Sequence, residues 1–196
     1  MLRRLFTALV LIVAGTAPAF AHLDPLEHGS FAAGFTHPLV GLDHILAMVA
    51  VGLWAASVGG KALWAVPAAF VGTMAVGFGA ALVGMPLPFV EPVILASVIF
   101  IGIMVALALP LPAIGVGAVV AFFALFHGHA HGGEMGEAGA FGYAGGFLVA
   151  TALLHAVGVA LGVGLGRALA TTRGAIGTRI AGGLTALGGL WLVIAG

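Results

Sequence analysis

Six long, nearly uncharged apolar stretches dominate this sequence, and they restrict its possible folds more than any other feature. They cover approximately residues 37–58, 62–83, 89–109, 113–126, 141–166 and 175–195. A helix needs about 20 apolar residues to cross a bilayer. The bilayer core offers no water, so a segment that crosses it must satisfy its backbone hydrogen bonds internally, as a helix does. We therefore expect an all-α integral membrane protein, a bundle of six transmembrane helices. The fourth stretch is short, so its helix should extend through His127 or His131, or end within the protein.

The overall composition excludes several classes of function. Hydrophobic residues make up 62% of the chain and charged residues 6%, which lies outside the range of soluble domains. Six basic and six acidic residues give a net charge of zero, so no basic surface is available for nucleic acid. Cysteine is absent, which excludes disulfides and thiolate metal sites. Gly60-Lys61 is followed by Ala62 and not by the Ser or Thr of a P-loop, so we expect no nucleotide.

The beginning of the chain has the pattern of a secretory signal peptide. Arg3 and Arg4 precede a short apolar run, and Ala19-Phe20-Ala21 matches the small-x-small cleavage pattern. We expect cleavage after Ala21, which divides the chain into a signal peptide, 1–21, and a six-span transmembrane domain, 22–196. A cleaved signal leaves the mature N-terminus on the extracytoplasmic side.

The basic residues indicate the orientation of the spans. Short links make consecutive spans antiparallel, so alternate links lie on the same side of the membrane. With the N-terminus outside, Lys61, Arg167 and Arg173 fall in cytoplasmic links, and Arg179 lies close to the same face. This distribution follows the positive-inside rule. We expect a multi-pass protein of a bacterial inner membrane, with its acidic residues and most histidines on the periplasmic side.

The first apolar stretch carries ionisable residues in the sequence THPLVGLDH. His37 and His44 are seven positions apart, which places them on one face of a helix, and Asp43 precedes the second histidine. On a straight helix the two histidines lie about 10 Å apart along the axis, too far to hold one ion. Either Pro38 and Gly41 distort this turn, or the two residues serve successive positions along a path. Ionisable residues are expensive in a bilayer and therefore indicate function.

A second cluster, FHGHAHGGE, follows the fourth apolar stretch. In a continuing helix His127 and His131 are four positions apart and Glu134 follows three later, which brings all three to one face. If the helix unwinds at its glycines, alternate histidines including His129 can converge instead. The simpler alternative is a solvated glycine-rich loop. Three imidazoles and a carboxylate within eight residues favour metal binding.

Other residues are weaker candidates for the same chemistry. Glu91 opens the third span, where it can also serve as a favourable charge at a helix N-terminus. His155 lies within an apolar span, either in a core hydrogen bond or on an ion path. His22 and His28 lie in a polar leader that can collect metal or simply be mobile. Imidazole and carboxylate ligands together suit nickel, cobalt and zinc, without choosing among them.

The two histidine motifs resemble the signature motifs of the HupE/UreJ family of nickel/cobalt permeases. The first is His37-Pro38, four residues and Asp43-His44, and the second runs from Phe126 to Glu134. The resemblance extends over the signal peptide and the order of the six spans. It implies a secondary permease that imports nickel, with cobalt as the other candidate, to supply hydrogenase or urease maturation. It assigns function to His37, Asp43, His44, His127, His131 and Glu134, and also to Phe70 and Glu91.

A function of another class is an intramembrane metal-dependent enzyme, because histidines and carboxylates in spans can hold a catalytic metal with an open position. The inner half of the chain offers little for such a site besides His155, which favours the permease over an enzyme. A permease needs no permanently bound cofactor. Its expected partners are a divalent metal ion and the lipid bilayer, and no pattern in the sequence indicates an oligomeric state.

Overall fold

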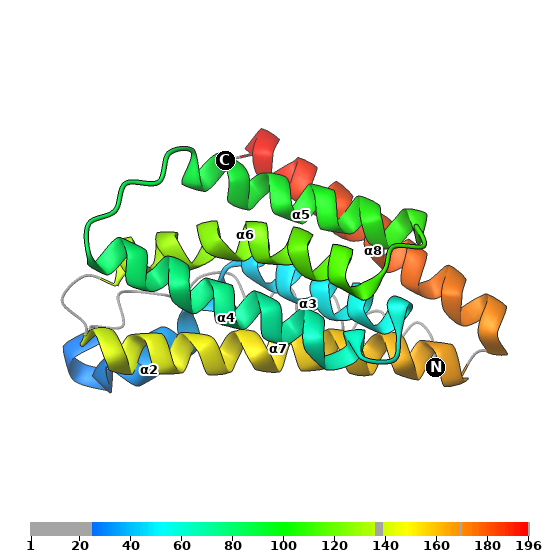
Figure 1. The fold of residues 1–196 in the computed structure, drawn as a ribbon, viewed down its shortest axis with the longest axis horizontal. Helices are drawn as coiled ribbons and strands as arrows, with labels where there is room; N and C mark the ends of the chain where they lie inside the picture. Colours follow the sequence, from blue (N-terminus) through cyan, green and yellow to red (C-terminus); the bar gives the residue numbers. More distant parts are fainter. Residues whose placement is uncertain (1–24, 136–138, 169, 196) are drawn as a thin grey trace.

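The computed structural model describes residues 25–135, 139–168 and 170–195, and these form helices and no strands. The helices are α2 (Pro25–Val40), α3 (Leu42–Val58), α4 (Ala62–Leu82), α5 (Val90–Leu107), α6 (Ala113–Glu134), α7 (Ala140–Ala168) and α8 (Ala170–Ala195). Consecutive helices from α3 to α8 run in opposite directions, as Figure 1 shows. The expected all-helical class is confirmed. The expected signal peptide and His22 lie outside the described residues.

The first span differs most from the expected pattern, because it is broken. Five helices of the described chain are long and apolar enough to cross a membrane without a partner. The segments Ser30–Val40 and Leu42–Val58 pass that test only together, with a bend of 80° between them. The bundle therefore has six spans if the bent pair is counted as one. Helix α2 also begins at Pro25, within the segment expected to be a polar leader.

The fourth span follows one of its expected courses. Helix α6 continues past Phe126 through all three histidines and ends at Glu134. The glycines of this segment do not unwind it, because Gly128 and Gly132 face α4 and let the two helices approach closely. The i,i+4 arrangement of His127 and His131 is therefore the one present.

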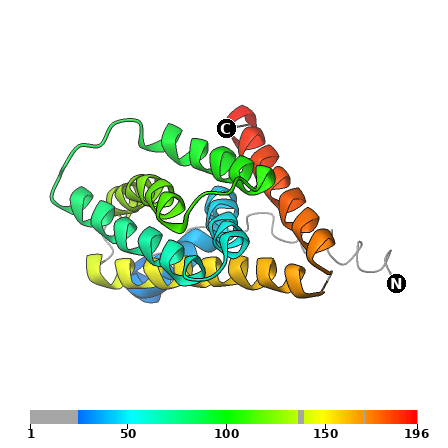
Figure 2. The ribbon, with the colours of Figure 1, turned by 45° about the vertical axis from the view of Figure 1, so that its right-hand side comes forward.

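Helix α3 lies at the centre of the bundle and contacts all the other described helices. Its side chains from Ala50 to Ala55 are buried. The most extensive contacts around it pair α4 with α6, α5 with α8, and α7 with both α2 and α3. Figures 1 and 2 both place α3 between the α5–α8 pair and α7. Side chains on α3 can therefore meet groups from several helices.

Close packing at these contacts depends on pairs of glycines on facing helices. A Cβ atom on Gly77 or Gly128 would overlap a backbone carbonyl across the α4–α6 contact. The same holds for Gly52 and Gly158 across the α3–α7 contact. Small residues allow such approach where lipid provides no hydrophobic drive for helix association. The glycines thus set the distances between the helices that carry the histidines.

Charged residues separate to the two ends of the bundle, as the sequence predicted. Asp43, Glu91 and Glu134 lie near the first turns of α3 and α5 and the last turn of α6, at the end where α2 bends into α3. The described basic residues gather at the opposite end, before α4, at the end of α7 and early in α8; they are Lys61, Arg167, Arg173 and Arg179. The bundle therefore has one acidic, histidine-rich end and one basic end.

Replacing Gly128 with alanine should destabilise the bundle. The added Cβ would overlap the Met74 carbonyl oxygen and force α4 and α6 apart, and overpacking of this kind costs about 1–3 kcal/mol. Thermal unfolding in detergent should show a lower Tm for Gly128→Ala. The control is Gly117→Ala on the same helix, where the new Cβ meets Ala69 at 4.0 Å. Equal Tm values for both variants would contradict the close-packing role of Gly128.

Candidate metal centre

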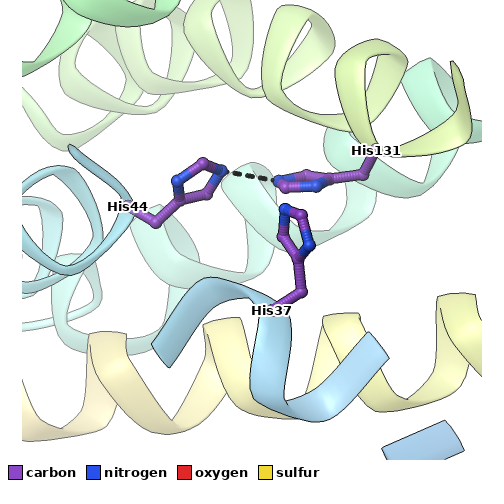
Figure 3. Close-up of side chains that lie close together, drawn as sticks. All are labelled: His37, His44 and His131. Atoms are coloured by element: carbon purple, nitrogen blue, oxygen red, sulfur yellow. Dashed lines mark hydrogen bonds between the residues drawn. The ribbon is translucent and has the colours of Figure 1, made fainter. Parts of the chain in front are cut away.

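Three histidine side chains from three different helices converge at the acidic end of the bundle. They are His37 of α2, His44 of α3 and His131 of α6, and Figure 3 shows their rings facing one another. One ring nitrogen from each lies within 4.8 Å of the others. We call these side chains the three-histidine cluster. It is the group that could hold a metal ion within the described residues.

The bend between α2 and α3 brings His37 and His44 together. Gly41 leaves the helical conformation, with φ −82° and ψ 118°, and its carbonyl accepts the first hydrogen bond of α3, from Ile45. Pro38 lies inside α2, where a proline removes a backbone donor and weakens the last turn. The ring centroids of His37 and His44 are 5.8 Å apart as a result. Of the two sequence alternatives, the distorted turn is the one present.

His44 is the most strongly connected member of the cluster. Its Nε2 lies 2.8 Å from Nε2 of His131, the hydrogen bond drawn in Figure 3. Its Nδ1 lies 2.8 Å from Oδ1 of Asp43. A Cβ atom on Gly41 would come within 2.8 Å of both Asp43 and His44, so the missing side chain at Gly41 leaves room for this pair. Asp43 thus orients the ring whose other nitrogen faces the cluster.

Glu134 lies at the open side of the cluster. Its Oε2 is 3.6 Å from Nε2 of His37 and 3.8 Å from Nδ1 of His131. The side chains of Glu134 and His37 are 48% and 36% exposed, whereas that of His131 is fully buried. The cluster is therefore partly exposed on the side of Glu134 and His37, which we call its mouth, and buried on the side of His131.

Two further histidines lie deeper than the cluster. His127 is fully buried and its ring centroid is 5.6 Å from that of His44. His155 is fully buried on α7 and hydrogen-bonds the Met48 carbonyl oxygen through Nδ1. Phe70, also fully buried, contacts both rings, at 5.7 Å from His127 and 4.9 Å from His155 between centroids. His127, His155 and Phe70 therefore adjoin the cluster without belonging to it.

Other sequence candidates are not brought into the cluster. His129 points elsewhere and its Nε2 lies 2.7 Å from the Met85 carbonyl oxygen, in the link between α4 and α5. Glu91 is exposed in the first turn of α5 and is not among the residues that converge. His28 lies on α2 and the structure does not describe its side chain. The metal-binding role of these residues stays a prediction.

Two aromatic residues of α7 support the cluster and were not identified from the sequence. The Phe147 ring centroid is 4.0 Å from that of His131, and the Tyr143 ring is 6.1 Å from that of His37. Both are buried and stand four residues apart, with Thr151 and His155 following at the same interval. This i,i+4 series along one face of α7 is the sequence pattern from which the two aromatic residues could have been identified.

The geometry suits a small divalent cation with mixed ligands. Three imidazole nitrogens can approach a central ion, and bonds of about 2.1 Å in tetrahedral arrangement would separate His44 and His131 nitrogens to about 3.4 Å. The present separation is 2.8 Å, so the rings would move apart by roughly half an ångström. The nearby carboxylates of Asp43 and Glu134 carry the two negative charges that balance such an ion.

Comparison with known proteins agrees with the motifs. A family model described as HupE / UreJ protein matches residues 9–192. The protein named Protein HupE from Rhizobium leguminosarum bv. viciae is 49% identical over 117 residues, which cover 60% of this chain and 61% of that protein. The matched segment thus spans less than two thirds of that relative. No solved structure matches this chain.

Replacing Gly41 with alanine should weaken metal binding while the fold is kept. Alanine tolerates the Gly41 backbone angles, but its Cβ would displace the Asp43 carboxylate and the His44 ring. Loss of such an orienting contact should reduce Ni²⁺ affinity by about 10-fold or more, measured by equilibrium dialysis in detergent. The control is Gly72→Ala, where a Cβ meets nothing within 4 Å. Unchanged affinity in Gly41→Ala would argue against the Asp43–His44 pair as part of the site.

Proposed function

This chain belongs to the HupE/UreJ family, and from that membership we propose that it is a secondary permease that imports nickel, with cobalt as the alternative substrate. The observation that carries the proposal is the convergence of His37, His44 and His131 at a solvent-accessible mouth. In this proposal the ion passes through unchanged, so the protein is not an enzyme and holds no permanent cofactor. The imported ion would supply hydrogenase or urease maturation.

The cluster exchanges the hydration shell of the ion for protein ligands. An ion that reaches the mouth first meets Glu134 and His37, which are partly exposed, and then His44 and His131 inside the bundle. Mixed nitrogen and oxygen ligands favour a divalent first-row cation over softer or harder ions. A transport site must also release its ion, which partly exposed and adjustable ligands permit. His127, His129 and Glu91 are proposed as further ligands near this path.

The proposed orientation places the cluster on the side from which the ion enters, and the membrane potential gives the direction of transport. We place the acidic, histidine-rich end on the periplasmic side of a bacterial inner membrane, with the mature N-terminus outside after removal of residues 1–21. Basic residues then face the cytoplasm, in agreement with the positive-inside rule. An inside-negative potential of 100 mV favours inward movement of a divalent ion by about 4.6 kcal/mol. Facilitated diffusion driven by this potential and by intracellular use of the metal is sufficient for import.

Uptake into proteoliposomes tests the proposed function. Purified full-length protein should take up Ni²⁺ or Co²⁺ into vesicles that have an inside-negative potential, and Zn²⁺ uptake measured in parallel gives the selectivity. Asp43→Asn removes the charge beside His44, and His44→Gln replaces a nitrogen ligand with a weak amide ligand. Each should lower uptake per inserted molecule by about 10-fold or more. Thr185→Val on α8 is the control, because its hydroxyl bonds only Ala181 of its own helix. Near-normal uptake in both site variants would reject the cluster as the ion path.

The proposed orientation can be tested with single cysteines, since the natural chain contains none. Gly133 near the cluster and Lys61 before α4 are both exposed and lie at opposite ends of the bundle. In intact cells with a permeable outer membrane, an impermeant thiol reagent should label Gly133→Cys and spare Lys61→Cys. Lys61→Cys should react only in inverted membrane vesicles. The reverse pattern would mean that the cluster faces the cytoplasm and would reject the proposed orientation.

A further inference from the structure

Unpaired polar atoms extend into the bundle beyond the three-histidine cluster. Six buried side-chain atoms in the described part of the chain make no hydrogen bond: Nδ1 of His44, His127 and His131, the Tyr143 hydroxyl, Oγ1 of Thr151 and Nε2 of His155. Of these, only Nδ1 of His44 lies at contact distance from a charged partner, the Asp43 carboxylate at 2.8 Å. Native proteins leave few such groups unpaired, and each one calls for a physical explanation. All six lie on α3, α6 and α7, the helices that line the cluster and the region beneath it. A polar occupant of this region would satisfy the other five.

The hydrogen bonds of His127 determine which of its nitrogens is free. Ser97 donates its hydroxyl hydrogen to the Ile94 carbonyl oxygen at 2.6 Å. The Ser97 oxygen can therefore only accept from Nε2 of His127, which lies 3.0 Å away. In the neutral ring the proton is then on Nε2, and Nδ1 presents an unshared electron pair. That Nδ1 is the buried, unpartnered nitrogen.

The same reasoning applies to His155. Its Nδ1 lies 2.8 Å from the Met48 carbonyl oxygen, which can only accept, so Nδ1 carries the proton. Nε2 then presents an unshared pair, and it too is buried without a partner. Metal-ligating histidines usually donate their second nitrogen to a carbonyl or another oxygen in this manner. His127 and His155, which we call the inner pair, both have this arrangement although only His127 belongs to a recognised motif.

The inner pair lies one helical turn deeper than the cluster. His127 precedes His131 by four residues on α6, and His155 bonds Met48, four residues after His44 on α3. Four residues correspond to an axial step of about 6 Å. Between ring centroids, His127 is 5.6 Å from His44 and Phe70 is within 5.7 Å of both inner histidines. Contacts between rings therefore run without interruption from the cluster to His155.

We propose that His127, Phe70 and His155 form a second, deeper binding station for the transported divalent cation. The ligands are Nδ1 of His127 and Nε2 of His155, and the Phe70 ring, which contacts both imidazoles, adds cation–π attraction. This proposal rests on the proposed permease function and extends the path one turn beyond the cluster. Thr151, one turn from His155 on the same face of α7, adds an unpaired hydroxyl oxygen.

The chemistry of this station suits brief occupancy. Two neutral imidazoles, a hydroxyl and an aromatic face bind a divalent ion more weakly than a cluster flanked by carboxylates. Neither inner histidine pairs with a carboxylate among the described contacts. An ion that leaves the carboxylates for the inner pair is therefore ready to leave again, and weak successive sites are what conduction requires.

Transport by His155 variants separates a ligand role from a structural one. Asn places its amide nitrogen where His has Nδ1, so His155→Asn can keep the bond to Met48 while it removes Nε2. His155→Leu removes both. A ligand role predicts that both variants lose uptake by about 10-fold or more while Ni²⁺ binding at the cluster is kept. If His155 only braces α7 against α3, His155→Asn will transport normally and only His155→Leu will fail, which would overturn the proposal.

A direct test uses the absence of cysteine in the natural chain. In detergent, Co²⁺ added to His155→Cys should produce a thiolate-to-cobalt charge-transfer band, because the new thiolate replaces a proposed ligand. His131→Cys in the cluster should produce a similar band. Thr185→Cys, buried on α8 away from the path, should produce none.

The three spectra distinguish the failure of each proposal. A band from His131→Cys without one from His155→Cys would show that cations stop at the cluster and are not held in the deeper region. The deeper station would then be rejected while the permease proposal stands. No band from either variant would reject the cluster as a metal site and with it the proposed function. Bands from both, and none from Thr185→Cys, support the deeper station.

Discussion

The 80° bend at Gly41 is the constraint on which the rest of the site depends. A straight helix would hold His37 and His44 about 10 Å apart. The bend instead places their rings 5.8 Å apart, with His131 of α6 against both. Ionisable groups within a membrane are costly unless they serve a bound ion or a polar partner. Concentrating them at one break, beside a solvent-accessible mouth, limits that cost.

The glycine contacts fix the relative positions of the helices that carry the histidines. Gly128 lies between His127 and His131 on α6 and faces the Met74 backbone, so the contact that joins α6 to α4 also positions both imidazoles. Gly52 faces the His155 carbonyl in the same way and joins α3 to α7. Helices that pack with their backbones in contact have no room for an added side chain, which would separate them. The same glycines therefore hold the helices together and position the histidines of the site.

Beyond the inner pair the bundle is closed by apolar side chains. Trp54, Val66 and Ile101 are almost fully buried and lie further along α3, α4 and α5 toward the basic end. The partly exposed cluster residues thus lie at the acidic end, and a buried apolar layer lies between the inner pair and the basic end. A permease with this arrangement must move helices or side chains to release its ion, since a dehydrated cation cannot cross a dry apolar layer. The weak ligands proposed at His155 adjoin the layer that must open.

The sequence by itself determined the helical class, the apolar spans, the charge separation and the two motifs, because each depends on residues close together in the chain. It also left two alternatives for the first motif: Pro38 and Gly41 distort the turn, or His37 and His44 serve successive positions along a path. Only the tertiary structure decided that His131 joins His37 and His44 while His129 turns to Met85, because neighbouring helix positions face different directions. It alone revealed Tyr143, Phe147 and the free nitrogens of His127 and His155. Those features depend on which helices touch, and in this chain that is set by backbone contacts at glycines far apart in sequence.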